Sequence, residues 1–224
     1  MNVNRILAAL VVTGSMTLVP TTARGEAISF EGLGNASVVR LGGMVNEYVY
    51  AGELNWSFTG TAPDGFNQSF YSYCVDVLHD LQPAQTVSAG GTGDLNGGAY
   101  AADGGARAAW LFNTFAGAAH VAGASVQAAA LQVAIWEALY DSTLDLAAGN
   151  IQLTWANAAV MAQAATYLQA LALAPYQGSG ATVLLTTGGQ SQITVPEPAT
   201  VLLIGMGLGL FLLLKKKVIG FNTN

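Results

Sequence analysis

The sequence predicts an α+β domain in which a β-barrel or β-sandwich part is followed by an alanine-rich helical part and two closing strands. The first half of the chain is rich in Val, Tyr, Phe and Trp between turn residues, a composition typical of strands. Alanine-rich segments with strong helix formers follow, and strand-like segments then return. This order of strands, helices and strands indicates segregated parts.

The elements can be placed by residue range. The four early strands are expected at 27–33, 37–43, 46–60 and 67–81, and the two closing strands at 181–187 and 190–195. Residues 88–98 (SAGGTGDLNGG) predict a flexible glycine-rich loop. Helices are expected at 105–119, 125–141 and 154–174, and Pro175 ends the last of them.

The N-terminal segment 1–27 is predicted to be a signal peptide. Arg5 provides a positive start, a long apolar stretch follows, and small residues precede the domain. Cleavage after Gly25 or after Ala27 satisfies the small-x-small rule. The mature domain is therefore expected to span residues 28–194.

The C-terminal segment predicts a single transmembrane helix at 199–214. Its 16 residues carry no charge, and at the helical rise they cover about 24 Å, against about 30 Å for a hydrocarbon core. Lys215, Lys216 and Lys217 can snorkel to the interface. By the positive-inside rule they mark the cytoplasmic side, so residues 218–224 form a cytoplasmic tail and the domain faces outward.

This end of the chain also carries a motif. Pro196, Glu197 and Pro198 precede the apolar span, and the lysine cluster follows it. Residues 195–217 therefore resemble the PEP-CTERM sorting signal of Gram-negative bacteria, although that signal usually stops at a basic cluster rich in arginine. The resemblance implies partners in the secretion machinery and exosortase. It also implies membrane anchoring before C-terminal processing, and a place in the cell envelope or on the outer surface.

The charge of the mature domain excludes one class of partner. Arg40 and Arg107 are its only basic residues, against eleven acids, and it contains no lysine. Nucleic-acid binding depends on basic side chains that neutralise phosphates, so no nucleic-acid partner is expected.

Cys74 is the only cysteine in the 224-residue sequence. An unpaired cysteine in an exported protein is unusual, since it lacks a disulfide partner in its own chain. Strand alternation places Cys74 on a mixed face with Ser72 and Asp76, which indicates that it points at another element. A lone cysteine is most often a small buried hydrophobe.

Gln132 is the second unusual residue. At about 100° per residue, it lies at the centre of the apolar stripe of its helix, with Ile135 and Trp136 close by and Glu137 pointing away. A buried amide without partners costs about 1–3 kcal/mol. Either neighbouring groups satisfy this amide, or it has been chemically converted.

A cysteine thiolate can attack a glutamine carbonyl, expel ammonia and leave an internal thioester. Such a bond requires the sulfur and the carbonyl to be held together, which a strand and a helix can do through proximity. It also requires water to be excluded, and Phe70, Tyr73 and Trp136 are candidates to shield it.

These residues resemble the signatures of bacterial thioester domains. Tyr73, Cys74 and Asp76 lie in the sequence YCVD, and Gln132, Ala134, Ile135 and Trp136 match the form Gln-x-Ala-Ile-Trp. The family often has Thr or Phe where this chain has Leu131. The resemblance implies a Cys74–Gln132 cross-link that attaches the protein covalently to a target amine on a surface or matrix polymer. The absence of lysine fits a group reserved for a different partner.

The alternative is a structural protein of the exopolysaccharide or biofilm matrix that binds without covalent chemistry. Exposed aromatic side chains could then stack on sugars, and the candidates are Tyr48, Tyr50, Trp56 and Trp155.

An enzyme is not expected, because neither His79 nor His120 forms a recognisable dyad with Cys74. If the cysteine strand continues, His79 faces its opposite side. Asp94 with Asn96, and Asp141 with Asp145, are interpreted as turn and cap residues rather than a calcium loop. No metal or cofactor is therefore expected.

Overall fold

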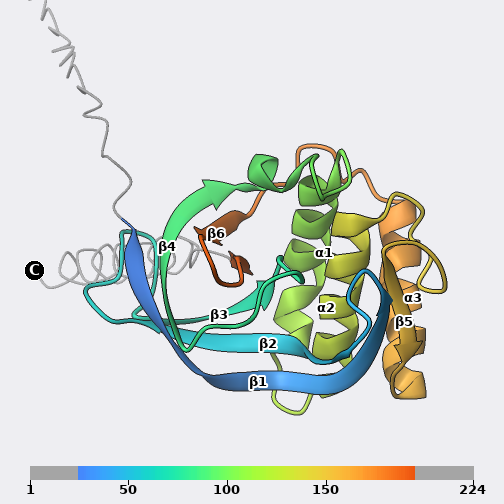
Figure 1. Cartoon of the computed structure of the whole chain (residues 1–224), viewed down its shortest axis with the longest axis horizontal. Coiled ribbons are helices and arrows are strands. Elements are labelled where there is room, and N and C mark those ends of the chain that lie inside the picture. The colour runs from blue at the N-terminus through green and yellow to red at the C-terminus, as the bar shows by residue number, and fades with distance from the viewer. Residues whose placement is uncertain (1–24, 195–224) are drawn as a thin grey trace, which may run out of the picture.

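The computed structural model describes residues 25–194, in which a curved sheet lies beside a group of three α-helices (Figure 1). The strands are β1 (Glu26–Gly43), β2 (Tyr48–Phe58), β3 (Ser69–Cys74), β4 (Ala84–Gly91), β5 (Ile151–Trp155), β6 (Thr182–Thr186) and β7 (Gln192–Thr194). The helices are α1 (Gly104–Ala119), α2 (Ser125–Tyr140) and α3 (Ala158–Ala172), with a short 3₁₀ helix, η1, at Thr92–Leu95. The α+β class is confirmed.

Six of these strands close into a barrel. The hydrogen-bonded order is β2-β3-β7-β6-β4-β1, and β1 pairs with β2 to complete the ring. The strand β5 lies outside the ring and pairs with the last residues of β1, from Arg40 to Gly43. All the pairings are antiparallel. Of the two predicted alternatives, the structure therefore has the barrel.

The strand β1 merges two predicted strands into one that bends. Its register against β2 shifts between Phe30 and Gly32 and again between Leu33 and Ala36. Such irregularities bend a strand and increase its twist. The bend lets the start of β1 pair with β4 in the barrel while its end pairs with β5 beside the helices (Figure 1).

Helix α2 is the central helix of the domain. It packs against α1 and α3 on one side and against β1 and β2 on the other. Every residue from Ala128 to Tyr140 is buried. Glu137, predicted to point away from the apolar stripe, is also fully buried, because neighbouring elements cover the whole circumference of the helix.

Three expectations about the elements are wrong. The predicted loop 88–98 starts with the end of β4, whose residues pair with β6 despite their glycines. The strand β5 occupies the start of the predicted third helix, because it pairs with β1. The cysteine strand ends at Cys74 rather than at residue 81, since a turn begins there.

None of the helices between residues 25 and 194 has the length and apolar character needed to cross a bilayer. The predicted transmembrane helix 199–214, the tail 218–224, the sorting residues and nearly all of the signal peptide lie outside the described residues. Since β1 begins at Glu26, cleavage after Gly25 would leave this strand whole.

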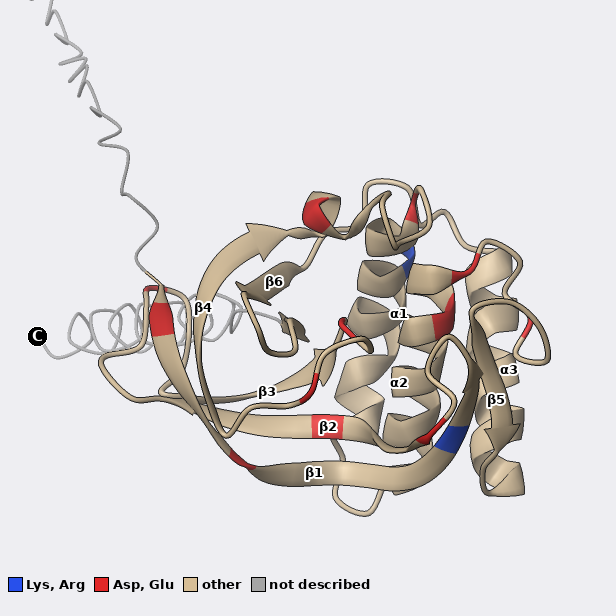
Figure 2. Ribbon diagram, viewed as in Figure 1, with Lys and Arg blue, Asp and Glu red and all other residues tan. Residues whose placement is uncertain are grey.

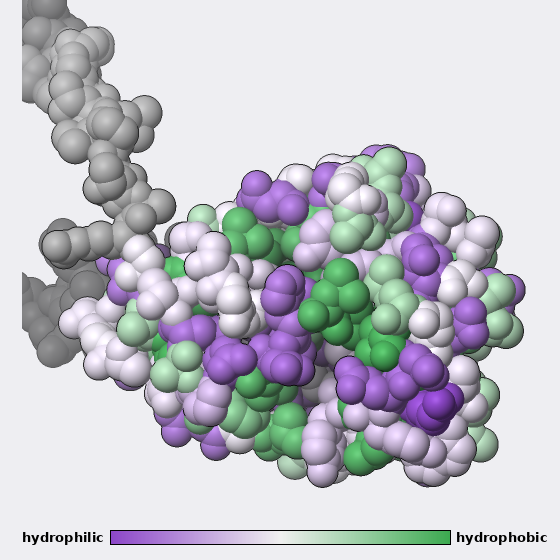
Figure 3. All heavy atoms as spheres, in the orientation of Figure 1, coloured by the Kyte–Doolittle hydropathy of each residue, from purple (hydrophilic) through white to green (hydrophobic). Residues whose placement is uncertain are grey.

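The surface of the domain is acidic and carries no broad apolar area on the face shown. Figure 2 shows acidic segments on strands, helices and loops, with basic segments on β1 and α1. In Figure 3 apolar side chains form separate small patches between polar ones. Extended apolar patches mark docking surfaces in many proteins, and this face has none.

Candidate functional site

The end of β3 and the middle of α2 meet at Cys74 and Gln132. The backbone N–H of Cys74 donates to Gln132 Oε1 at 2.9 Å, and Gln132 Nε2 donates to the Cys74 carbonyl at 2.8 Å. Both side chains are buried, with 3% of Cys74 and 1% of Gln132 exposed. The structure thus brings the two predicted residues into direct contact, and the amide of the unreacted chain is satisfied by the backbone of Cys74.

The thiol of Cys74 is a neutral group. Burial raises its pKa to about 12, although a hydrogen bond to the Asp76 backbone and the nearby indole of Trp136 act in the opposite direction. The sulfur accepts from the Asp76 N–H at 3.3 Å. Trp136 Nε1 meets no acceptor with normal hydrogen-bond geometry, yet the ring is close enough to lower the pKa of the thiol. Such a thiol is protonated at neutral pH.

The residues after Cys74 form a tight turn. The Asp76 carboxylate accepts from the Leu78 N–H at 3.2 Å and from His79 Nδ1 at 2.8 and 2.9 Å. Tyr140 of α2 accepts from the Val77 N–H at 3.3 Å through its hydroxyl oxygen. Helix α2 therefore holds this turn through Tyr140 as well as holding the cysteine through Gln132.

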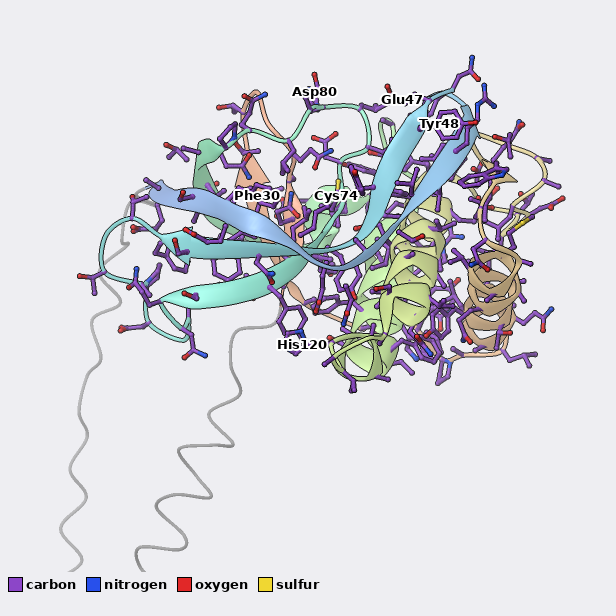
Figure 4. The ribbon with its side chains drawn as sticks, turned by 90° about the horizontal axis from the view of Figure 1, so that it is seen from below. Phe30, Glu47, Tyr48, Cys74, Asp80 and His120 are labelled. Atoms are coloured by element: carbon purple, nitrogen blue, oxygen red, sulfur yellow. The ribbon has the colours of Figure 1, made fainter. Side chains whose placement is uncertain are left out.

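A cavity of about 470 Å³ reaches both Cys74 and Gln132. Its walls come from β1, β2, the turn after β3 and α2. The polar or aromatic residues among its lining are Phe30, Glu47, Tyr48, Tyr50, His79, Asp80, Trp136 and Gln190. In Figure 4, Cys74 lies where the strands meet the helices, with Asp80 on a loop and Glu47 and Tyr48 at the end of the hairpin. The Cys74–Gln132 pair thus forms part of the wall of a cavity.

The predicted shielding residues do not all surround the sulfur. Trp136 lines the cavity, whereas Tyr73 and Phe70 do not. Tyr73 is buried against Phe112 of α1, at 5.9 Å between ring centroids, because it lies on the strand face opposite Cys74. Phe70 packs against Phe58.

Other predicted motif residues serve the packing of α2. Ala134 and Ile135 are fully buried, and neither lines the cavity. Trp56, proposed as an exposed sugar-stacking residue, is also fully buried, and its indole donates to Ser72 Oγ at 3.0 Å. Strand alternation turns Trp56 inward.

His79 also lies elsewhere than predicted. The prediction put it on the far side of a continuing strand, whereas the turn at Asp76 brings it to the cavity of Cys74. The signal for this turn is Asp76 itself, because aspartate side chains bond the backbone two residues on. His120 lies elsewhere, paired with Glu53 and stacked on Tyr71.

Within residues 25–194 no group of three or more His, Cys, Asp or Glu side chains could hold a metal ion. Asp94 and Asp141, interpreted as turn and cap residues, accept hydrogen bonds from the backbone. Asp94 accepts from the Gly91 N–H, and Asp141 accepts from the N–H groups of Asn150 and Ile151.

Comparison with known proteins identifies the C-terminal segment. Residues 194–217 match the PEP-CTERM protein-sorting motif, which confirms the prediction from Pro196, Glu197, Pro198 and the lysines. The motif implies an exported protein that exosortase processes and that is anchored to the membrane beforehand. No curated protein and no solved structure matches the chain.

Proposed function

We propose that the domain carries an internal thioester between Cys74 Sγ and Gln132 Cδ and uses it to attach covalently to a target amine. The observation that supports this most is the double hydrogen bond between the Gln132 amide and the backbone of Cys74. These two bonds hold the Gln132 amide against the residue that carries the sulfur. This geometry provides the proximity that the reaction needs.

Formation of the thioester needs no reactant other than Cys74 and Gln132. The sulfur attacks the Gln132 carbonyl carbon, the carbon–nitrogen bond of the amide breaks, and the thiol proton leaves with the nitrogen as ammonia. The Cys74 N–H already donates to Gln132 Oε1, so it is placed to stabilise negative charge on that oxygen during the attack. The thiol is neutral in this site rather than a thiolate, so its proton must leave the sulfur during the attack and pass to the departing nitrogen.

Attachment to the target then breaks the thioester, so each molecule can react only once. A target amine attacks the thioester carbonyl, the carbon–sulfur bond breaks, and Cys74 regains a proton. The target ends on Gln132 through an amide bond. The protein would therefore be a single-turnover linker rather than an enzyme, acting at the outer surface of a Gram-negative cell on an amine-bearing surface or matrix polymer.

The lysine-free sequence of residues 28–194 supports this function. A thioester reacts with lysine side chains, so a domain without them is protected from consuming its own reactive group or that of an identical neighbour.

The proposal is tested by treating the full-length chain with methylamine and mapping the product by peptide mass spectrometry. Methylamide on Gln132 is expected, together with a newly titratable Cys74 thiol. Cys74→Ala should abolish the labelling. An unlabelled Gln132 in the wild-type chain would reject the thioester.

One observation favours the alternative of non-covalent binding to the matrix. Tyr48, Tyr50 and Trp155 are 64%, 65% and 52% exposed, and the Tyr48 and Trp155 rings lie 6.0 Å apart. Exposed aromatic rings can stack on sugars. Retention on an exopolysaccharide column that is lost in Tyr48→Ala and Trp155→Ala but kept in Cys74→Ala would support this function.

A further inference from the structure

We infer that His79, positioned by Asp76, is the proton acceptor for the attacking amine in the thioester reaction, a role that rests on the proposed function. The ring of His79 lines the same cavity as Cys74 and Gln132. Nothing in the resemblance or in the sorting motif assigns a role to this residue.

The contact with Asp76 prepares the imidazole as a base. Both Asp76 carboxylate oxygens lie within 2.9 Å of His79 Nδ1. An imidazole whose Nδ1 donates to a carboxylate carries its remaining lone pair on Nε2. The Asp76 side chain is 11% exposed and the His79 side chain 56% exposed, so a mostly buried carboxylate orients a ring that solutes can reach.

The same turn connects the base to the leaving sulfur. The Asp76 N–H donates to Cys74 Sγ, and the Asp76 carboxylate holds His79. One short turn thus carries the leaving group, the residue that orients the base, and the base.

The target chemistry requires such a group. A primary alkylamine is protonated at neutral pH, with a pKa near 10 for a lysine side chain, and only its neutral form attacks a carbonyl. The charged residues that line the cavity with His79 are Asp80 from its own turn and Glu47 from the hairpin, and the tyrosines Tyr48 and Tyr50 line it too. Asp76 contacts the His79 ring itself. These carboxylates favour an approaching ammonium group.

His79 can also pass the proton that it accepts on to the Cys74 sulfur. After the amine attacks, His79 holds its proton, and the carbon–sulfur bond must break to release Cys74. Burial makes a free Cys74 thiolate unfavourable, so the imidazolium supplies the proton that the sulfur needs. The ammonium first gives one proton to solvent, the neutral amine gives a second to His79 during the attack, the sulfur receives that second proton, and His79 ends neutral.

The test uses full-length protein whose intact mass first shows the loss of ammonia, and then measures methylamine incorporation against pH. His79→Gln should keep the mass deficit while slowing incorporation by about 100-fold at neutral pH, a typical contribution of a general base. Free imidazole should restore part of the rate in His79→Ala, which a purely structural role would not allow.

The pH dependence of methylamine incorporation tests whether Asp76 acts on the His79 base or only helps to pack the turn. Asp76 raises the pKa of His79, and the neutral base is present above that pKa, so the wild-type rate should rise with pH through it. Asp76→Asn should move this inflection to lower pH, because the carboxylate that stabilises the imidazolium is gone. His79→Gln should remove the inflection.

His120→Gln is the matched control, because His120 lies away from the cavity, on the opposite side from Asp80 in Figure 4. Its rate of methylamine incorporation and the pH dependence of that rate should equal those of the wild type. A wild-type rate in His79→Gln, or a loss of the mass deficit in that variant, would overturn the role of His79 alone. A wild-type chain without the mass deficit would overturn the thioester and this role together.

Discussion

At the scale of single residues, Gln132 connects the middle of α2 to the end of β3. Its amide pairs with both backbone groups of Cys74 in a buried site. Removing one side of a buried hydrogen bond leaves the other side unpaired, and this costs more than the bond itself contributes. The residue is therefore a structural joint in the unreacted chain as well as the proposed acyl donor.

In the Cys74→Ala chain, which cannot form a thioester, Gln132→Ala should lower the free energy of unfolding by about 2–4 kcal/mol, because the N–H and C=O of residue 74 lose their partners inside the protein. Chemical denaturation measures this change. The matched control is Gln127→Ala on the same helix, where the side chain is only half-buried, and the change should stay near ~0.5 kcal/mol. Equal losses in the two variants would contradict the structural role of Gln132.

The contact between these two residues could be anticipated from the sequence, but their surroundings could not. A lone cysteine on a mixed strand face and an amide within an apolar stripe are both local signals. The position of His79 depends on where β3 ends, and the apolar pattern continues past that point. Strand alternation places Trp56 on one face of β2, but which face points inward depends on the pairing of β2 with β1 and β3.

At the scale of elements, α2 carries an unusual buried acid. Glu137 is fully buried, and neither of its carboxylate oxygens has a partner with normal hydrogen-bond geometry. Burial, followed by the nearby negative charge of Asp141, raises its pKa from 4.5 to about 8, although the Asp145 backbone lies near enough to lower the pKa slightly. The acid is therefore protonated in the folded chain under conditions in which it would ionise in the unfolded chain.

This shift predicts a pH-dependent stability. Since the folded chain binds a proton that the unfolded chain releases, stability falls as pH rises from about 4.5 to about 8. Glu137→Gln removes the ionisable group, so at pH 8 it should raise the free energy of unfolding on the order of 2–4 kcal/mol relative to the wild type. Near pH 4 the difference should vanish.

Denaturation curves at several pH values test this, with Asp64→Asn as the control because Asp64 is exposed. A constant difference between Glu137→Gln and the wild type across this range would show that Glu137 does not titrate as described.

The helices were easier to predict than the strands. Runs of alanine with leucine and glutamine favour helices through local propensity, and α1 and α2 lie within a residue of their expected positions. The strand β5 is short and β4 ends in glycines, so their identity comes from pairing with β1 and β6, which are distant in the sequence. Closure of the barrel likewise depends on pairing between strands that are distant in the sequence.

At the scale of the whole molecule, a lysine-free acidic domain precedes a PEP-CTERM sorting motif at residues 194–217. Where copies of an exported chain meet before processing, a lysine on the domain of one copy could consume a thioester on another. The absence of lysine from the domain removes that competitor.

Placing a lysine at the cavity should therefore consume the thioester. Leu78 lines the cavity and is half exposed, so Leu78→Lys should give a chain with a free Cys74 thiol and no response to methylamine. The introduced amine should be found in an amide cross-link to Gln132, within one copy or between two. Leu173→Lys is the control, because Leu173 is 89% exposed at the end of α3, away from the cavity, so its amine can reach a thioester only in another copy and should leave methylamine reactivity intact in dilute solution. Full methylamine reactivity in Leu78→Lys would contradict the account.

The most direct measurement is the intact mass and thiol titre of the untreated full-length chain, purified without amines or reductants. A thioester predicts a mass one ammonia below that of the sequence, no titratable thiol after denaturation at low pH, and the full mass in Cys74→Ala. A wild-type chain with its full mass and one free thiol would show that Cys74 and Gln132 meet only through hydrogen bonds.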